Sequence, residues 1–381
     1  MSKDQSRQQA GKIFAQLADA LETGTFGAGT TVALTTLGSE LGAEELVRGA
    51  ELAVAQNPGL EVVLVGAKVA TDLQVVESDC EADSHKIIEE MLASGRAQGA
   101  VTLHYNFPMG VSTVGRVLTP ARGKPMLIAT TTGTTATERV EAMVKNALGG
   151  IAVAKAIGLD KPRVGIVNVE GARQVERILK TLRDQGYPIE FTESVRRDGG
   201  CVLRGNDLLI GTADVVVCDT LTGNLLMKLF SAYSSGGTYE TLGWGYGPGV
   251  GYRFDKIINI ISRASGAPVV ANAIAYAAKC SQGDLLQLAA AEYQAAQKAG
   301  LEKLLAKSEK QPVQEVSPPG KKPVSADITG IDILELEEAV RVLWAKDIYA
   351  ETGMGCAGPV IMLAPEDLEN AKELLKEKGY I

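Results

Sequence analysis

The sequence of 381 residues has few of the side chains that metal centres and disulfide frameworks require. It contains two histidines and five cysteines, and the cysteines lie far apart with no CxxC pair. This argues against a structural zinc site and against a disulfide framework. No run of about 18 apolar residues is free of charged or turn residues, so we expect no membrane-spanning helix. Because the start of the chain is polar and unlike a signal peptide, we expect a cytoplasmic protein with reduced cysteines.

Signatures of nucleotide and nucleic-acid binding are also scarce. The motif G-x-x-x-x-G-K-[ST] does not occur, and the glycine-rich segment 236–251 has no G-x-G-x-x-G register. Lys and Arg number 38 against 46 Asp and Glu, a net charge of −8, and no Lys/Arg-rich run is present. We therefore do not expect a nucleic-acid partner. Segment 236–251 is interpreted as a mobile lid or a partner-facing loop, with an ordinary surface loop as the alternative.

Short runs rich in β-branched residues alternate with amphipathic stretches over most of the chain. Several of the runs are continuously apolar, which is typical of parallel strands that are buried on both faces. The alternation predicts an α/β fold with a doubly wound, mostly parallel sheet. The expected strands are 31–36, 61–66, 100–105, 125–131, 163–169, 213–219 and 359–363, and the expected helices include 43–56, 85–96, 138–157 and 172–185.

The composition also predicts a domain organisation. We expect residues 1–30 to form an N-terminal helix and 31–305 to form the α/β domain. Residues 306–330 are polar and proline-rich and are interpreted as a linker. Residues 331–381 would form a small α/β tail with a glycine-rich turn over 351–359. Because this tail is too short for a large core, we expect it to dock on the main domain or on a partner.

Ligands of open α/β sheets bind beyond the carboxyl ends of the strands, so we searched the loops there. The segment 130–138 (TTTGTTATE) combines hydroxyls with a predicted helix start, because Thr135 and Glu138 have capping-box spacing. Free backbone N–H groups at such a start bind anions. This indicates a phosphate site, with a well-capped helix without ligand as the alternative. The candidate residues are Thr132, Gly133, Thr134 and Thr135.

A second candidate follows the apolar strand at 213–219. If the next helix opens at Thr222 or Gly223, Asn224 lies in its first turn and Lys228 lies one turn further along the same face. The Asn224 amide, the Lys228 ammonium and the N–H group of Gly223 are suited to an oxyanion or a phosphate. An ordinary helix start explains the spacing equally well. Arg173 follows another strand and would either contact an anion or cap a surface helix.

A third candidate is Cys356 in the segment Gly353–Pro359 (GMGCAGP). A thiol flanked by small residues is accessible to a bulky acyl donor, and the glycines let the backbone approach a reacting carbonyl. A lone cysteine is more often an inert small residue, so the spacing alone does not decide whether Cys356 is catalytic. His104 ends a strand and is a candidate base, with a hydrogen-bonded structural histidine as the alternative.

The segment ADVVVCDTLTGNLLMK (213–228) resembles a segment of the phosphate acyltransferase family, ADVVV-x-DG-F-x-GN-x-x-LK. That family makes acyl phosphates from acyl carrier protein thioesters. The similarity extends over most of residues 31–280 and implies a fold related to isopropylmalate dehydrogenase. Three positions depart from the family pattern. Thr35-Thr36 stands where the family has aspartate and glycine, Thr220 replaces a glycine, and Val175 lies near the position of the family's lysine.

The N-terminal block and the tail (ETGMGCAGPVIMLAPEDLENAKELLKEKGYI) are similar to alpha subunits of component C of the glycine, sarcosine or betaine reductases of anaerobes. This second resemblance covers essentially the whole chain. It implies that an acetyl group arrives from a carboxymethyl intermediate on selenoprotein A, is held as a thioester on Cys356, and leaves as acetyl phosphate. It also implies a ketoacyl-synthase-like beta subunit as partner, an oligomeric assembly, and no metal or organic cofactor.

Three other functions stay open at this point. One is a phosphate acyltransferase that acts on longer acyl groups of acyl carrier protein. Another is a non-catalytic subunit that only docks its partners, for which the departures at Thr35 and Val175 are the best support. A dehydrogenase is the third, but no metal-binding aspartate cluster is evident in the sequence.

Overall fold

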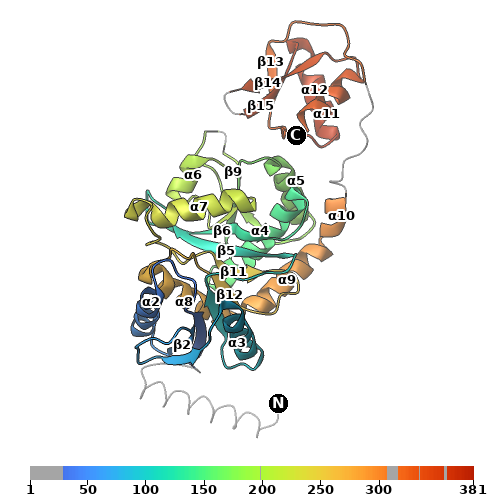
Figure 1. The fold of residues 1–381 in the computed structure, drawn as a ribbon. Coiled ribbons are helices and arrows are strands. Elements are labelled where there is room, and N and C mark those ends of the chain that lie inside the picture. Colours follow the sequence, from blue (N-terminus) through green and yellow to red (C-terminus); the bar gives the residue numbers. More distant parts are fainter. Residues whose placement is uncertain (1–28, 198, 307–315, 334, 356–357) are drawn as a thin grey trace, which may run out of the picture.

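The computed structural model describes residues 29–306 apart from 198, and residues 316–381 apart from 334 and 356–357 (Figure 1). Cys356 and residues 1–28 of the predicted N-terminal helix therefore lie outside the described residues, whereas Thr30, which that prediction included, begins a strand. In the described part, the main unit is built on a 12-stranded sheet and the C-terminal unit on a sheet of three strands. No helix among the described residues is long and apolar enough to cross a membrane.

The main sheet consists of two parallel halves, which confirms the predicted α/β class. The order is β3-β2-β1-β4-β12-β11-β5-β6-β10-β7-β8, with β9 beside β7. The first half contains β1 (Thr30–Thr35), β2 (Leu60–Gly66), β3 (Gln74–Glu77), β4 (Gly99–Thr102) and β12 (Ile258–Ile260). The second contains β6 (Pro125–Thr134), β7 (Arg163–Val167), β8 (Glu190–Phe191), β9 (Val202–Leu203) and β10 (Val215–Val217).

Two antiparallel strands join the halves, namely β5 (Val111–Leu118) and β11 (Gly247–Val250). The direction of the chain reverses from β12 to β11, from β11 to β5 and from β5 to β6. Three reversals mean that the parallel strands of the second half run opposite to those of the first. The carboxyl ends of the two halves therefore emerge at opposite edges of the sheet, which decides where each predicted site residue lies.

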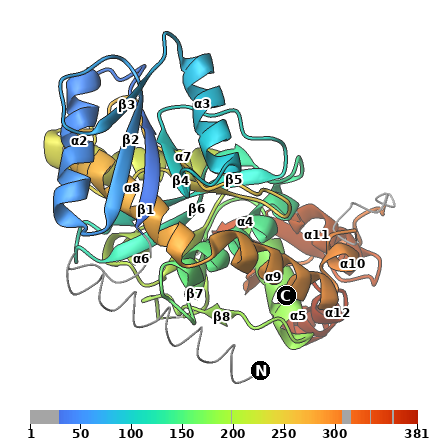
Figure 2. The same ribbon diagram turned by 90° about the horizontal axis from the view of Figure 1, so that it is seen from below.

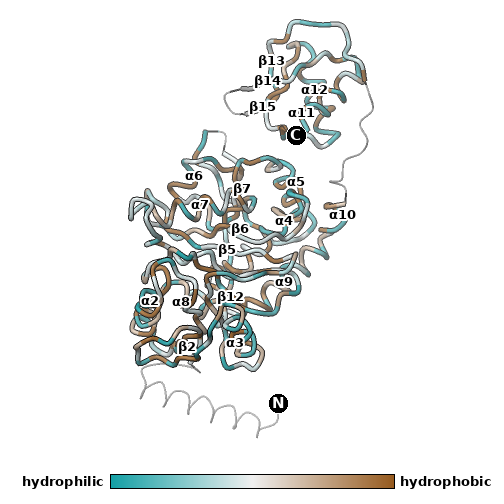
Figure 3. The backbone as a smooth tube through the Cα atoms, in the orientation of Figure 1, coloured by the Kyte–Doolittle hydropathy of each residue, from teal (hydrophilic) through white to brown (hydrophobic). Residues whose placement is uncertain are grey.

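Helices cover both faces of each half because alternate strand residues point to opposite faces. In the first half, Val32 and Leu34 pack toward α2 (Ala43–Gln56) and α8 (Ala267–Gln282), whereas Ala33 packs toward α3 (Glu81–Ala93). Figure 3 shows hydrophobic segments on α2, α8 and β2.

In the second half, α4 (Arg139–Ala156) and α5 (Ala172–Asp184) lie on one face. The helices α6 (Gly205–Ile210) and α7 (Thr220–Ala232) lie on the other. A short 3₁₀ turn, η1 (Tyr233–Ser235), continues α7. The next helices are α9 (Leu285–Lys298) and α10 (Leu301–Ala306). Because α9 lies along the outer side of α4 (Figure 2), α4 is buried nearly all round.

The C-terminal unit has a small core of its own. It consists of β13 (Ala326–Thr329), α11 (Leu336–Trp344), β14 (Ala350–Gly355), β15 (Gly358–Leu363), η2 (Pro365–Asp367) and α12 (Leu368–Glu377). The strands pair antiparallel in the order β13-β15-β14 and enclose the buried residues Ile328, Ile331, Leu336, Ala339, Val340, Leu343, Ala350, Ile361, Leu363, Ala371 and Leu375.

Two sequence-based expectations for this region were wrong. Residues 326–329, assigned to the linker, form an edge strand of the C-terminal sheet. The glycine-rich segment read as a turn forms two paired strands, in which Gly353 lies opposite Val360 and Gly355 opposite Gly358. Residues 353–358 also match the spacing G-x-G-x-x-G, but Gly355 ends one strand and Gly358 begins its antiparallel partner, so the last glycine does not open a helix and the spacing is not a dinucleotide fingerprint.

The C-terminal unit docks on α5 of the main unit, and the main unit was one of the two docking surfaces that the sequence left open, a partner being the other. The Arg177 guanidinium donates to the Glu335 carboxylate and to the carbonyl oxygen of Tyr380. The backbone N–H of Arg173 donates to the Asp332 carboxylate at 3.4 Å. These contacts hold the unit against the first turns of α5, which begin just beyond the carboxyl end of β7.

Candidate functional site

Two of the predicted loops lie together because β6 and β10 are parallel neighbours, with Val217 opposite Ala129. Two hydrogen bonds join the segments that follow. The Thr220 hydroxyl donates to the Gly133 carbonyl at 2.8 Å, and the Asn224 amide donates to the Thr131 carbonyl at 3.1 Å.

The glycine at 223 is required by the packing of α7 on β6. A Cβ atom at this position would lie 1.7 Å from the Thr130 carbonyl oxygen and 3.0 Å from the Cys218 sulfur. No side chain fits, so the helix touches the strand backbone directly. This close approach brings the Asn224 amide within reach of the Thr131 carbonyl.

The first turn of α7 differs from the prediction. The helix begins at Thr220, with Asp219 as its N-cap, and the Asp219 carboxylate accepts the N–H groups of Leu221 and Thr222 at 3.1 Å each. The N–H of Gly223 donates to the Asp219 carbonyl oxygen at 3.0 Å. Asn224 therefore lies in the second turn, and the N–H of Gly223 is held within the helix rather than presented to a ligand.

The predicted capping box at the start of α4 was also wrong. The N-cap is Glu138, which accepts the N–H of Glu141. Thr135 turns inward instead, and its hydroxyl approaches the carbonyl oxygen of Ala142 and the side-chain oxygen of Asn146. The buried Asn146 amide in turn donates to the Cys218 carbonyl at 3.2 Å, which links α4 to the end of β10. Asn146 is the one uncharged polar residue of α4, and this was the signal that sequence reasoning missed.

Between these loops lies a cavity of about 200 Å³, called here the β6/α7 pocket. It has the volume of about six water molecules, which is sufficient for a phosphate-sized anion. Arg139 contributes a cation that sequence reasoning missed, although it directly follows the predicted helix start. Its guanidinium pairs with Glu170 at 3.1 Å, and both side chains are half exposed. The lining residues are Thr134, Thr135, Ala136, Arg139, Ala142, Asn146, Asp219, Thr220 and Leu221.

Lys228 lies away from this pocket, at the junction of the two halves of the sheet. Because α7 runs back along the sheet, its Nζ reaches the carboxyl end of β12, 2.9 Å from the Ser262 hydroxyl and 2.6 Å from the Glu240 carboxylate. Glu240 is fully buried and also accepts the hydroxyl of Tyr246. Burial and the Glu240 charge raise the pKa of Tyr246 above its usual range. Lys228 therefore compensates a buried carboxylate.

Arg173 lies at a second cavity of about 200 Å³, between α5 and the C-terminal unit. Its guanidinium pairs with Glu176 at 2.8 Å, and Arg196 and Asp332 also line the cavity. Burial raises the pKa of Glu176, but hydrogen bonds from Lys180 and Arg173 outweigh that effect and lower it overall. The structure does not bring Arg173 into the β6/α7 pocket.

Three of the four described cysteines are buried and are poorly suited to nucleophilic chemistry. Burial raises the pKa of Cys201 to about 12, with the Glu176 charge adding to the effect, and burial also raises the pKa values of Cys218 and Cys280. Cys80 is exposed at the N-cap of α3 and donates to Asp83. The surroundings of Cys356 are not described.

The two remaining predictions concern His104 and segment 236–251. His104 has a ring nitrogen 3.0 Å from the Asn106 side-chain oxygen in an exposed loop. Segment 236–251 is largely structural, because it supplies β11, buries Tyr246 and holds Trp244 beneath the Arg116 guanidinium. The interpretation of the whole segment as a lid or partner loop was therefore wrong.

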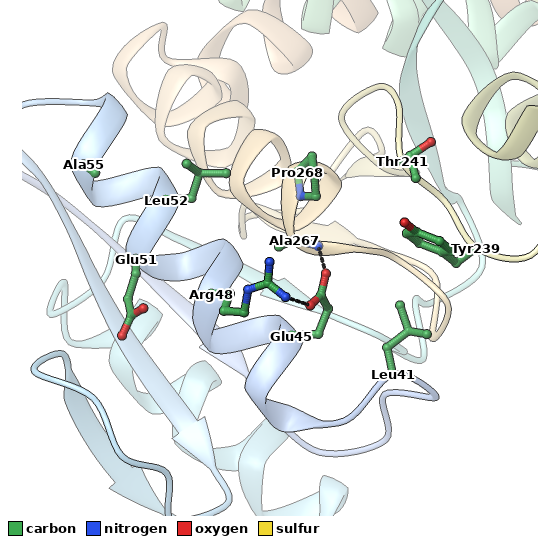
Figure 4. A pocket seen from close by; sticks show the side chains of 10 residues that line it. All are labelled: Leu41, Glu45, Arg48, Glu51, Leu52, Ala55, Tyr239, Thr241, Ala267 and Pro268. Atoms are coloured by element: carbon green, nitrogen blue, oxygen red, sulfur yellow. Dashed lines mark hydrogen bonds and ion pairs between the residues drawn. The ribbon is translucent and has the colours of Figure 1, made fainter. Parts of the chain in front are cut away.

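A further cavity, of about 860 Å³, lies elsewhere, along α2 and the start of α8 (Figure 4). Its most prominent polar feature is Glu45, which accepts the N–H of Ala267 at 2.7 Å and pairs with Arg48 at 2.9 Å. Glu45 thus caps α8. The other lining residues are Leu41, Glu51, Leu52, Ala55, Tyr239, Thr241 and Pro268, and none of the ten is a predicted site residue.

Comparison with known proteins gives concordant matches. A family model described as "Fatty acid synthesis protein" matches residues 30–362. The glycine/sarcosine/betaine reductase complex component C subunit alpha of Peptoclostridium acidaminophilum is 55% identical over 98% of this chain and 99% of its own length. A phosphate acyltransferase of Thermotoga petrophila is 25% identical over 52% of this chain and 66% of its own.

Among solved structures, a branched-chain phosphotransacylase from Enterococcus faecalis superposes with a TM-score of 0.49 and 17% identity. It covers 66% of this chain and 99% of the other.

Proposed function

The chain belongs to the fatty acid synthesis protein family and, within it, to the component C alpha subunits of glycine/sarcosine/betaine reductase, and from this premise we propose that it transfers an acetyl group to phosphate. The acetyl group derives from a carboxymethyl intermediate on selenoprotein A and leaves as acetyl phosphate. The relatives named as phosphate acyltransferases support phosphate as the acceptor. A ketoacyl-synthase-like beta subunit is the proposed partner, and the complex works in the cytoplasm.

In the proposed step, the acetyl group is held as a thioester on Cys356. An oxygen of phosphate attacks the thioester carbonyl carbon and forms a tetrahedral oxyanion. The carbon–sulfur bond then breaks, Cys356 leaves as a thiolate, and acetyl phosphate is released. Holding the group on the protein divides one difficult transfer into two easier ones. Cys356 rests on the sequence alone, as the one cysteine among small residues on both sides.

The observation that carries the proposal is the meeting of the β6 and α7 segments at one pocket. The Asn224 amide has two N–H bonds, of which the Thr131 carbonyl takes one. The other is suited to the oxyanion, and the bond to Thr131 fixes its direction in advance. Thr134 and Thr135 line the β6/α7 pocket together with Arg139 and would contact the phosphate. Thr132, Gly133 and Asn224 are not among the residues that line it, and we propose that they act at its edge.

The other residues predicted to bind phosphate have indirect roles in the proposed mechanism. Gly223 acts by letting α7 approach β6. Lys228 and Arg173 would bind phosphate only after releasing Glu240 and Glu176. Because these ion pairs already occupy both cations, they favour a second candidate function, in which the chain docks its partners without catalysing a reaction.

The test is phosphate-dependent or arsenate-dependent breakdown of a small acetyl thioester by the purified chain, alone and with its partner subunit. Transfer to phosphate requires activity that falls in Arg139→Ala and is retained in Arg48→Ala, a matched change on the exposed face of α2. No turnover under either condition supports the docking subunit. Turnover that increases with the length of the acyl chain supports an acyl carrier protein substrate instead.

A further inference from the structure

The cavity of about 860 Å³ is a groove that follows α2, and we call it the α2/α8 groove. Its α2 side is formed by residues at intervals of three or four, which share one face of the helix. These residues are Glu45, Arg48, Leu52 and Ala55. Tyr239 and Pro268 lie across from them (Figure 4). A cavity of this volume takes several large side chains at once.

The described chain begins at one end of this groove. The N–H of Thr30 donates to the Gly59 carbonyl at 3.0 Å, and Gly59 lies three residues beyond the end of α2. The Thr30 hydroxyl accepts the side-chain amide of Gln282, the last residue of α8, at 3.0 Å. Residues 1–28 therefore join the fold where α2 and α8 both end, which is the Ala55 end of the groove.

The sequence before this point has the pattern of an amphipathic helix. At 100° per residue, its large apolar residues fall within about 100° of one another, and its polar residues fall on the opposite side. The apolar residues are Ile13, Phe14, Leu17 and Leu21, and the polar ones are Lys12, Gln16, Asp19 and Glu22. A stripe of this width is typical of a helix that packs on one side against an apolar surface.

The dimensions of the segment match those of the groove. From Glu45 to Ala55, α2 rises about 15 Å, and a helix over residues 12–22 rises by the same amount. The seven residues from Glu22 to Gly29 span up to about 23 Å, so the segment can reach the groove from its point of attachment. Because the segment is tethered, its effective concentration is about millimolar, which favours it over a second copy or a partner in solution.

We propose that residues 12–22 bind in the α2/α8 groove as a helix parallel to α2. Leu21 then lies at the Ala55 end of the groove, and the apolar stripe of the segment faces α2. The segment also covers the Glu45 carboxylate and shields from water the 2.7 Å hydrogen bond with which Glu45 caps α8. This contact does not depend on the proposed transfer reaction.

Disulfide trapping in the full chain tests where the segment binds. In a Cys80→Ser background, which removes an exposed thiol, Leu21→Cys with the exposed Ala55→Cys should form an intrachain disulfide on mild oxidation. Mass spectrometry identifies the linked peptides. The matched control is Asp19→Cys with Ala55→Cys, which should not link because residue 19 lies on the opposite face of the helix. Equal linkage of the two pairs, or no linkage of the first, would overturn the proposal.

Hydrogen exchange of the full chain tests whether the segment is bound. We expect the amides of residues 13–21 to be protected, and Leu17→Asp to reduce that protection by about tenfold or more because an apolar anchor becomes charged. Gln16→Asp adds the same charge on the opposite face and should retain the protection. Unprotected amides in the wild type, or equal loss in both variants, would contradict the proposal. A disulfide between two chains, or protection that requires a partner subunit, would assign the segment to another molecule, and the proposal would fail.

Discussion

Replacing Gly223 by alanine tests whether the contact between α7 and β6 builds the proposed site. The new Cβ would lie 1.7 Å from the Thr130 oxygen, and real contacts of this kind are not shorter than 3.0 Å, so the helix must retreat by at least 3.0 − 1.7 = 1.3 Å. Forcing an extra carbon into a packed contact costs about 1–3 kcal/mol. Loss of the 3.1 Å bond between Asn224 and Thr131 adds about 1 kcal/mol.

The expected result is a free energy of unfolding lowered by about 2–4 kcal/mol, together with a loss of acetyl transfer, because the Asn224 amide moves with the helix. Urea denaturation followed by circular dichroism measures the first quantity, and the thioester assay measures the second. The control is Gly205→Ala at the start of α6, where an added Cβ meets no atom within 4 Å. If both variants unfold at the same urea concentration and remain equally active, the reasoning is refuted.

Four further predictions follow from other contacts. Asn224→Ala should lower the rate of phosphorolysis by about 10²–10³ at unchanged fold, and an unchanged rate would remove the amide from the site. Cys356→Ser should abolish acetyl phosphate formation, which full activity would contradict. Arg177→Ala should leave Glu335 without its partner and loosen the C-terminal unit, so that amides of α11 exchange hydrogen faster; unchanged exchange would refute that contact. The folded-state pKa of Glu176 lies below its unfolded value, so its stabilisation is present above the unfolded value and declines as pH falls through the folded one. Glu176→Gln should remove that part of the pH dependence in denaturation curves, and an identical pH profile would contradict the assignment.

The sequence was sufficient to predict the parts of the site that depend on neighbouring strands. The apolar runs before 130–138 and before Asp219 indicated parallel strands, whose carboxyl ends share an edge when the strands are adjacent. The segments lie side by side as that reasoning requires, although the Asn224 amide bonds to Thr131, one residue before the predicted Thr132–Thr135 segment, and the shared phosphate site stays a prediction. Their pairing through Thr220 and Gly133 follows from the adjacency of β6 and β10.

The remaining contacts depend on pairings that local patterns do not encode. Lys228 meets Glu240 and Ser262 because the two halves of the sheet run in opposite directions, which only the order of β12, β11, β5 and β6 reveals. The glycines at 353–358 favour a turn locally, yet residues 350–355 and 358–363 pair as antiparallel strands, and the more distant β13 pairs with the other edge of β15.

The central claim is that acetyl held on this chain passes to phosphate. Its most direct test is peptide mass spectrometry of the full chain after incubation with a small acetyl thioester, before and after phosphate is added, with acetyl phosphate measured in parallel. The account predicts an acetyl group on the peptide that contains Cys356, and its disappearance as acetyl phosphate forms. Acetyl on Cys80 instead, or a label on Cys356 that phosphate does not discharge, would contradict it.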